Sequence, residues 1–408
     1  ALLLGGLPKQ GQTLEEVKDL LLSEIKKLRA GEFDEKMLEA NINNFKLGEL
    51  QNMESNEGRA DMFVNSFING TDRMAKLTKE DIVAFANKYL KEDNYAVIYK
   101  KQGKDPNEKK MTKPEITPII TNRDVTSPFL VEVQESAVKP IEPVFLDYQK
   151  DMSQLKAKSD IPVLYKQNVA NDLFQLIYVF DMGNNHDKAL GTAFDYLEYL
   201  GTSDMTPEEL KSEFYRLACT FYVSPGNERT YVVLSGLNEN MPAAVQLFEK
   251  LLADAQVNKE AYTNMTSDIL KARSDAKLNQ GQNFSRLMSF AMYGPKSPAT
   301  NLLTEAELTN MNPQELVDRI HNQNSYKHRI LYYGPSSSKD LLATINQYHQ
   351  VPAALKDIPA GNEYSYLETP VTKVLVAPYD AKQIYMAQIS NLDKKYDPAI
   401  EPIRALYD

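Results

Sequence analysis

Proline is concentrated in one stretch of this chain, between residues 101 and 160. The prolines there are Pro106, Pro114, Pro118, Pro128, Pro140 and Pro143. Proline fixes φ and has no backbone N–H, so this density excludes a long helix and a central strand. We therefore expect a long extended connection between two globular bodies. Apolar islands at 116–120, 129–133 and 141–148 indicate that the connection lies against a surface.

Residues 161–350 alternate between strand patterns and helix patterns. Thr206, Pro207 and Glu209 have the order of an N-cap, a first helical residue and a capping-box partner. We expect strands at 161–165, 173–180, 219–223, 230–237 and 328–333, and helices at 188–200, 207–217, 241–254, 259–278, 313–323 and 339–349. This order predicts an α+β domain with an antiparallel-type sheet backed by helices.

Both flanks of this domain carry parts of the same pattern. Residues 1–100 predict amphipathic helices at 14–30, 34–54, 58–69 and 78–90, followed by a strand at 95–99. These helices lack the strands that they would cover, so we expect the later part of an α+β domain. Residues 351–408 predict a linker, strands at 372–377 and 383–392 and a helix from Pro398, which would be the start of a further domain. The recurrence predicts tandem homologous domains.

The composition argues against several classes of partner and site. A formal net charge of −10 over 408 residues argues against nucleic acid and anionic membranes as partners. No apolar run approaches the ~18 residues of a membrane-spanning helix. Cys219 is the single cysteine, which excludes an internal disulfide and a cysteine-based zinc site.

The histidines form no local metal-ligand pair. They are His186, His321, His328 and His349, and no two of them lie three or four residues apart. A catalytic zinc site usually needs two or three histidines. Distant histidines could still converge in space, but we favour a structural role for each of them.

The stretch GTAFDYLEYLGTSDMTPEEL at 191–210 has the form of a metallopeptidase helix without its metal ligands. A working helix of the inverse-zincin type carries His-x-x-Glu-His, in which two histidines on one helix face hold zinc and the glutamate activates water. Here Asp195 and Tyr199 stand at the histidine positions, and Glu198 stands at the position of the base.

With this helix and the segment KPEITPIITNRDVTSPF at 113–129, the chain resembles the insulinase/pitrilysin family of zinc metallopeptidases, in particular its bacterial zinc proteases. The resemblance implies four homologous α+β domains that form a clamshell around a peptide chamber. Residues 1–100 then resemble the later part of the second domain and 101–160 the linker between the halves. Residues 161–350 resemble the third domain, with a degenerate zinc helix, and 351–408 a linker and the truncated start of the fourth.

The resemblance also implies that the chain is an interior fragment that lacks the zinc-binding domain. Family members with zinc use a further glutamate about 75 residues after the zinc helix; here the nearest acids are Asp268 and Asp275. The Arg/Tyr pair that helps to bind substrate backbone would lie beyond Asp408. We therefore assign no catalytic, cofactor-binding or metal-ligating residue to this chain, and expect zinc in the parent enzyme alone.

The predicted function follows from this placement. The parent would be a zinc metalloendopeptidase that hydrolyses peptides in its chamber, and this portion would form chamber wall and hinge and be inactive alone. Its partners would be peptide substrate and the missing zinc-bearing N-terminal domain. Two alternatives stay open: a non-catalytic scaffold or regulatory subunit of the same fold, and an unrelated α+β binding protein. The compartment is open, with the bacterial periplasm slightly favoured over the cytoplasm.

Three groups of side chains have both a functional and a structural interpretation. Asp195, Glu198 and Tyr199 could offer oxygen ligands to a hard cation, but we favour a packed helix whose polar groups face solvent. Arg273 and Lys277 could face a chamber, but mixed charges at this spacing are typical of a solvated helix face. The tyrosines Tyr215, Tyr222, Tyr231, Tyr332 and Tyr333 could line a chamber, but we favour core positions. Tyr364–Tyr366 could add to a sheet edge.

Overall fold

The computed structural model describes residues 2–9, 11–70, 78–101, 103, 115–118, 125–137, 139–140, 142–380, 383–391 and 398–407. The chain divides into two compact units. The first combines Ala1–Glu35 with Met74–Tyr148, and the second combines Lys36–Arg73 with Gln149–Asp408. The predicted domain boundaries remain predictions.

The first unit contains the helices α1 (Leu14–Ala30), α4 (Lys79–Tyr89) and α5 (Pro128–Glu135). Thr13 caps α1 through a capping box with Glu16, as its sequence predicts. The Asn87 side chain of α4 donates to the backbone oxygen of Arg29 at 2.9 Å, which joins α4 to the end of α1. α5 begins at Pro128 and has eight residues, in keeping with a proline-rich stretch that excludes long helices.

The predicted strand at 95–99 is wrong. The segment is not a strand, and Tyr95, Val97 and Ile98 are exposed. A strand needs a neighbour for its ladder of hydrogen bonds. Among the described residues, no backbone hydrogen bond pairs this segment with another one. The alternating pattern alone therefore does not make it a strand.

In the second unit, one sheet of six strands organises the chain. Its strands are β1 (Ser153–Lys156), β2 (Pro162–Gln167), β3 (Leu173–Phe180), β4 (Cys219–Pro225), β5 (Thr230–Leu237) and β6 (Arg329–Gly334). Their order across the sheet is β1-β2-β6-β3-β5-β4. All neighbours are antiparallel except β2 and β6, which are parallel. The predicted fold class, an antiparallel-type sheet backed by helices, is confirmed. β1 lies within the stretch 101–160 that was predicted as linker.

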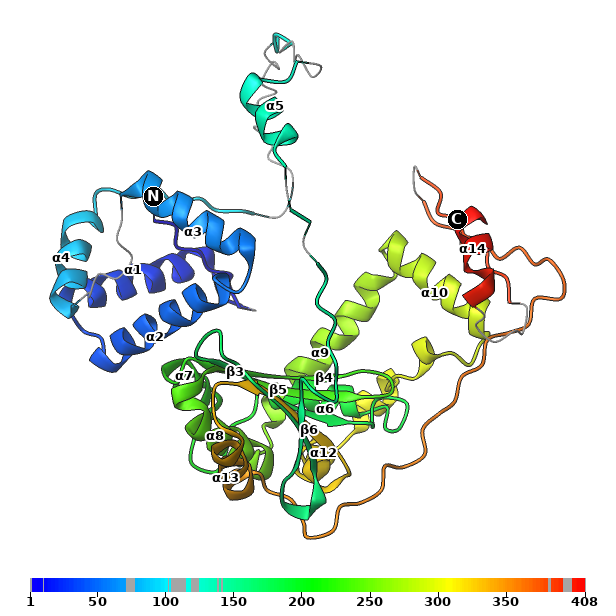
Figure 1. Ribbon diagram of the computed structural model, residues 1–408. Coiled ribbons are helices and arrows are strands. Elements are labelled where there is room, and N and C mark those ends of the chain that lie inside the picture. Colours follow the sequence, from blue (N-terminus) through cyan, green and yellow to red (C-terminus); the bar gives the residue numbers. More distant parts are fainter. Residues whose placement is uncertain are drawn as a thin grey trace. The chain divides into compact units, whose positions relative to one another are not determined.

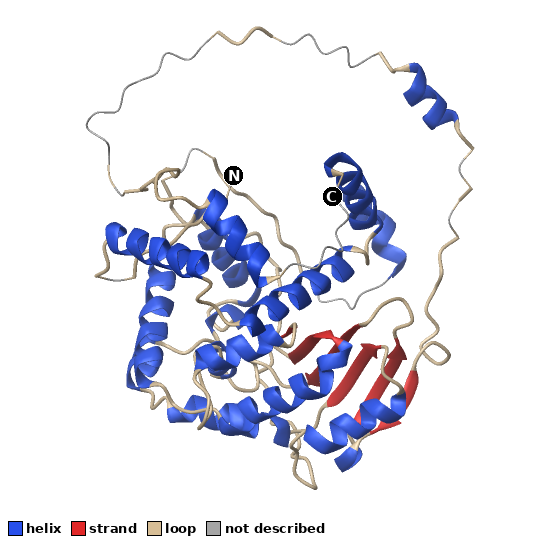
Figure 2. Ribbon diagram, turned by 90° about the vertical axis from the view of Figure 1, so that its left-hand side faces the viewer, coloured by secondary structure: helices blue, strands red, loops and turns tan. Residues whose placement is uncertain are grey.

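Helices lie against one face of this sheet, as Figure 1 shows for α8, α12 and α13, and Figure 2 shows the sheet from another side. At one end of the other face, Leu47 packs against Leu173 and Leu237. The remaining helices of the unit are α2 (Glu35–Asn52), α3 (Asn56–Asn69), α6 (Leu190–Leu197), α7 (Pro207–Arg216), α8 (Met241–Asp254), α9 (Lys259–Ala276), α10 (Gln280–Tyr293), α11 (Glu305–Asn310), α12 (Gln314–Asn322), α13 (Ser338–Tyr348) and α14 (Glu401–Tyr407). Short 3-10 turns lie at Lys158–Asp160, Asn238–Asn240, Pro298–Thr300, Gln323–Ser325 and Pro398–Ile400.

The core follows the alternation of the strands. Phe174, Leu176, Tyr178 and Phe180 of β3 all point toward the helices and are almost completely buried. Most of the helices predicted in 161–350 agree with the structure within a few residues, but α10 and α11 were not predicted. No helix in the described part of the chain is long and apolar enough to cross a membrane.

The strand pair predicted at 372–377 and 383–392 is also wrong. Residues 372–377 and 383–391 are not strands in the structure, whereas Leu392 lies outside the described residues. Most of the large apolar residues in these segments, such as Val374 and Ile384, are exposed. As at 95–99, a strand-like pattern without a paired neighbour does not make a strand.

Candidate functional site

The turn before α6 depends on a glycine. Gly183 lies so close to the neighbouring turn that an added Cβ would be 2.4 Å from the backbone oxygen of Gly226. The Asn184 side chain then accepts the backbone N–H of Gly191 at 2.9 Å, and the Asp187 carboxylate accepts that of Ala189 at 2.9 Å. These bonds satisfy free N–H groups in the first turn of α6 and set its direction.

The side chains of Asp195, Glu198 and Tyr199 face away from the core. Asp195 and Glu198 are exposed, and Tyr199 is 46% exposed. Phe194, Tyr196, Leu197 and Leu200 all have relative exposures of 3% or less. α6 also ends at Leu197, so that Tyr199 lies beyond the helix. The packed-helix interpretation therefore describes this segment.

Tyr196 fixes α6 to the start of α9. Its hydroxyl donates to the backbone oxygen of Asn258 at 2.6 Å and accepts the Asn258 N–H at 2.9 Å. Its ring meets Tyr262 edge-on, with centroids 5.7 Å apart. Tyr196 is thus a structural anchor with a satisfied hydroxyl.

The residues at the motif do not fit zinc. Partial desolvation of the carboxylate, and then the neighbouring charge of Glu198, raise the pKa of Asp195 above its ordinary value, although the residue as a whole is exposed. Zinc sites favour histidine and cysteine ligands, and oxygen donors alone suit hard cations. The more distant Asp275 pairs with Lys271 at 2.6 Å, and Asp268 is exposed. Within the described ranges, no group of three or more His, Cys, Asp and Glu residues could hold a metal ion.

The face of the sheet opposite the helices carries exposed tyrosines. The helix-covered face takes Phe221 of β4, Val232 of β5 and Tyr332 of β6, so their neighbours in sequence point the other way. These neighbours are Tyr222, Tyr231 and Tyr333, which are 53%, 38% and 44% exposed. We call the surface formed by Tyr222, Tyr231, Tyr333 and Ile177 the open sheet face.

The strand register places these side chains in rows. Tyr222 is paired with Val233, and Val233 with Ile177 of β3. In the next row Val179 is paired with both Tyr231 and Arg329. Tyr333 is paired with Gln175, so the open sheet face combines its tyrosines with aliphatic and polar residues, and the row of Tyr231 ends at Arg329.

Two arginines share one carboxylate at that end. Arg229 Nε donates to Asp181 Oδ1 at 2.7 Å, and Arg329 Nη1 donates to Asp181 Oδ2 at 2.6 Å. The hydrogen bond from Arg329 is the main cause that lowers the pKa of Asp181, with a further contribution from Arg229. The cluster has one positive charge in excess, beside Tyr231.

The other sequence candidates have structural partners. Tyr332 is buried, and its hydroxyl accepts the backbone N–H of Ser336 at 3.1 Å. The Tyr215 hydroxyl bonds to Asn41 Oδ1. Arg273 donates to the backbone oxygen of Leu303 at 2.7 Å. Tyr366 stacks on Tyr293 of α10 at 4.8 Å, so this segment packs on a helix and not on a sheet edge.

The structure brings together two of the histidines that are distant in sequence. His328 Nε2 and His349 Nε2 lie 2.9 Å apart, and His349 Nδ1 lies 2.6 Å from Glu249 Oε1. Glu249 was not identified from the sequence. Its position carried a signal, because it lies four residues after Val245 and three before Leu252, on the buried stripe of α8.

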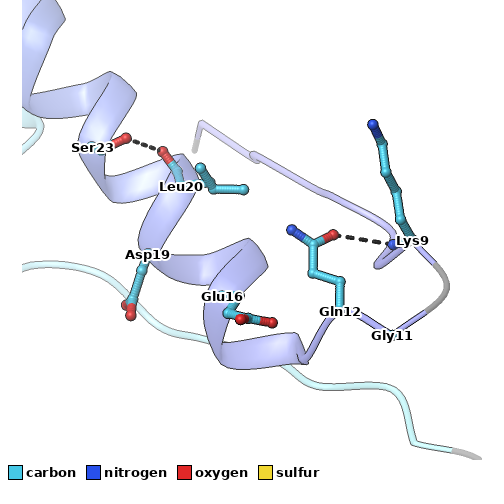
Figure 3. A pocket seen from close by; sticks show the side chains of 7 residues that line it. All are labelled: Lys9, Gly11, Gln12, Glu16, Asp19, Leu20 and Ser23. Carbon is cyan, nitrogen blue, oxygen red and sulfur yellow. Dashed lines mark hydrogen bonds between the residues drawn. The ribbon is translucent and has the colours of Figure 1, made fainter.

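A surface hollow of about 710 Å³ lies in the first unit, beside α1 (Figure 3). Gln12 Oε1 accepts the Lys9 N–H at its rim, and Ser23 donates to the backbone oxygen of Leu20. It is lined by Lys9, Gly11, Gln12, Glu16, Asp19, Leu20 and Ser23. The Glu16 carboxylate is already used by the capping box, and the hollow is open, so it offers no catalytic arrangement.

Comparison with solved structures finds several peptidases. The chain is similar to a peptidase M16 inactive domain from Pseudomonas fluorescens, with 17% identity, a TM-score of 0.45, and coverage of 52% of this chain and 54% of that one. It is also similar to the periplasmic protease PqqL from Escherichia coli, with 12% identity, a TM-score of 0.47, and coverage of 86% and 43%.

A third similar structure is a mutant of the ferredoxin protease FusC in complex with Arabidopsis ferredoxin, with 13% identity, a TM-score of 0.46, and coverage of 72% of this chain and 30% of that one. The chain thus spans about half or less of the length of these three structures. No protein-family model and no curated protein matches the sequence.

Proposed function

We propose that the chain is a non-catalytic portion of a zinc metallopeptidase of the insulinase/pitrilysin type. In this proposal it forms part of the wall of a peptide chamber, and the zinc is held by a domain outside this sequence. Peptide hydrolysis, the zinc-bearing partner domain and a periplasmic location all belong to the proposed parent enzyme.

The open sheet face is the observation that carries the proposal. A sheet that is covered by helices on one side buries its apolar residues there and usually presents polar residues to water. Here Tyr222, Tyr231 and Tyr333 remain 53%, 38% and 44% exposed on the other side. Tyr222 lies in the row of Ile177 and Leu331, whereas Tyr231 lies in the next row, with Val179. Exposed tyrosines offer both apolar area and a hydrogen-bonding hydroxyl, which suits contact with extended peptide.

The degenerate helix supports the non-catalytic part of the proposal. Asp195, Glu198 and Tyr199 face solvent, and the donor set does not fit zinc. Tyr196 nevertheless keeps α6 in place through its two bonds to Asn258. A helix that keeps its anchor and lacks a ligand set suits a structural copy of a catalytic domain.

A peptide-binding measurement tests the proposal. An unstructured fluorescein-labelled peptide should bind the 408-residue chain and raise its fluorescence anisotropy. The combined variant Tyr222→Ser, Tyr231→Ser and Tyr333→Ser should weaken this binding about tenfold or more, a loss of about 1.4 kcal/mol. Tyr199→Ser removes a tyrosine of similar exposure outside the sheet and should leave affinity unchanged. No binding by the unmodified chain, or equal binding by the triple variant, would contradict the proposal.

A scaffold or regulatory subunit of the same fold is the second candidate. It is favoured by the same misfit of the α6 donor set, because such a subunit needs no metal. The gene that encodes the chain distinguishes the two. An upstream His-x-x-Glu-His motif in the same reading frame supports the peptidase, and its absence from the full reading frame supports the scaffold.

A further inference from the structure

A chain of buried hydrogen bonds crosses the core of the sheet domain. It consists of Glu249 of α8, His349 at the end of α13 and His328 just before β6, and we call it the Glu–His–His network. These residues are 1%, 0% and 6% exposed. The contacts run from Glu249 Oε1 to His349 Nδ1 at 2.6 Å and from His349 Nε2 to His328 Nε2 at 2.9 Å. His328 Nδ1 then lies 2.7 Å from the backbone oxygen of Tyr326.

The acceptor at the far end fixes the number of protons. A backbone carbonyl oxygen can only accept, so His328 Nδ1 carries a hydrogen. The Nε2–Nε2 contact needs one hydrogen, and so does the contact between His349 Nδ1 and Glu249 Oε1. Three protons therefore satisfy three hydrogen bonds. With no titratable protons, the glutamate carboxylate and the two imidazole rings would carry one negative charge each, three in all. The three protons cancel these charges, so the complete network has no net charge.

A fourth proton placed at either of the two inner contacts breaks a hydrogen bond. If the additional proton is placed on the second nitrogen of the Nε2–Nε2 contact, two N–H groups point at each other and neither nitrogen can accept. Placed at the other contact, it sets O–H against N–H. Glu249 Oε2 is also occupied, because it accepts the Gln350 N–H at 3.0 Å and the Asn324 side-chain N–H at 3.0 Å. The fourth proton would also leave a positive charge in the core, where charge is costly.

The network ties together parts of the domain that are far apart in sequence. Glu249 holds both the side chain of His349 and the backbone N–H of Gln350, where the chain leaves α13. His328 stands at the start of β6, and Asn324 in the turn before it. Loss of the network would therefore free the end of α13 first, because its bonds to α8 pass through the Glu249 carboxylate.

We propose that the Glu–His–His network is an acid-sensitive latch, in which uptake of a fourth proton breaks a hydrogen bond and releases the end of α13 and Gln350 from α8. At neutral pH the latch is closed, with three protons and no net charge. In acid the open form takes up the additional proton and is favoured.

The surroundings offer no counter-charge for the additional proton. Tyr178 of β3 packs on His349 with ring centroids 4.4 Å apart, and Phe180 packs on His328 at 4.6 Å. The Tyr178 hydroxyl stays neutral, since burial and then the charge of Glu249 raise its pKa well above the ordinary value. Burial, and then the charge of His349, lower the pKa of His328 from 6.5 to about 4. The other groups at the network are the Asn324 amide and the backbone of Tyr326 and Gln350.

Hydrogen exchange of the 408-residue chain tests the latch. Protection factors for a peptide spanning 345–352 should fall about tenfold per pH unit between pH 6.5 and pH 4, because opening binds one proton. His328→Gln can still donate to Tyr326 and accept from His349, but it does not titrate. Its protection should be independent of pH in this range. His321→Gln removes an exposed histidine outside the network and should keep the slope of the unmodified chain.

A second measurement needs no variant. The ring nitrogens of His328, observed by nitrogen NMR, should show a neutral imidazole with hydrogen on Nδ1 from pH 7 down to pH 5. Titration of His328 near pH 6.5 would overturn the proposal. So would a flat pH profile in the unmodified chain, or equal slopes in the unmodified chain and in His328→Gln.

Discussion

His349 Nδ1 lies 2.6 Å from Glu249 Oε1, although the two residues are 100 positions apart in the sequence. Neither side chain is more than 1% exposed. A buried carboxylate is tolerated only where its lone pairs are occupied, and Gln350 and Asn324 complete the set at Glu249. The pair therefore holds α8 and the end of α13 in one relative position.

Removal of the Glu249 carboxylate should be strongly destabilising. Glu249→Ala leaves His349 Nδ1, the Gln350 N–H and the Asn324 amide without their acceptor in the core. We expect a loss of about 3–5 kcal/mol in the free energy of unfolding, measured by urea denaturation. Glu249→Gln can donate to His349 and still accept the hydrogen bonds of Gln350 and Asn324, so its loss should be clearly smaller. Equal losses in the two variants would contradict this account.

The stability of the chain should decrease in acid because of His328. The folded-state pKa of about 4 lies below the ordinary 6.5, so the unfolded chain binds the proton first as the pH falls. Stability is therefore complete above pH 6.5 and is lost as the pH falls toward 4. The expected loss from this group is about 3 kcal/mol. The measurement is the unfolding free energy of the unmodified chain and of His328→Gln, each at pH 7 and at pH 4.5. Subtracting the change in the variant from the change in the unmodified chain cancels the contribution of the carboxylates.

Tyr196→Phe should loosen the junction of α6 and α9. The variant keeps the ring contact with Tyr262 but loses both hydrogen bonds to Asn258. We expect a loss of about 1–2 kcal/mol in unfolding free energy, because the N–H of Asn258 is left without a partner. Tyr199 lies two residues beyond the end of α6, and Tyr199→Phe should change the unfolding free energy by less than about 0.5 kcal/mol. Similar effects of the two substitutions would argue against Tyr196 as an anchor.

The unmodified chain should hold no stoichiometric zinc and hydrolyse no peptide. Its α6 offers Asp195, Glu198 and Tyr199, which lack the nitrogen donors that zinc prefers. Atomic emission spectroscopy after dialysis against zinc should find far less than one metal ion per chain. A zinc enzyme of known stoichiometry, dialysed in parallel, serves as the positive control. One tightly held zinc in the unmodified chain would refute the prediction.

Much of the sheet domain could be predicted from local sequence signals. The Thr206–Pro207–Glu209 capping pattern marks the start of α7 within one residue, and the apolar run Leu173–Phe180 is β3. Such signals act over a few residues and need no knowledge of the remaining chain. The helix α10 was not predicted because its sequence QGQNFSRLMSFAMY begins with polar residues and a glycine, and it buries none of its residues completely.

The failures concern pairing between distant segments. The strand-like sequence at 95–99 has the right alternation, but no local signal says whether a neighbour exists. The exposed tyrosines of the open sheet face were not predicted for the same reason. Tyr222 and Tyr231 share a face because β4 and β5 are paired, but which face the helices cover depends on packing over more than 100 residues. For that reason these tyrosines were expected in the core, and this interpretation is correct only for Tyr332.

The parallel pair of β2 and β6 has a consequence for the order in which the domain can form. β2 joins the sheet only through β6, and β1 joins only through β2. β3, β5 and β4 are complete once residue 237 has been synthesised, whereas β6 ends at residue 334. During synthesis the hairpin of β1 and β2, which ends at residue 167, must therefore wait until β6 begins at residue 329 before it finds its neighbour. Long-range pairing of this kind is slow, and it makes β6 the strand that closes the sheet.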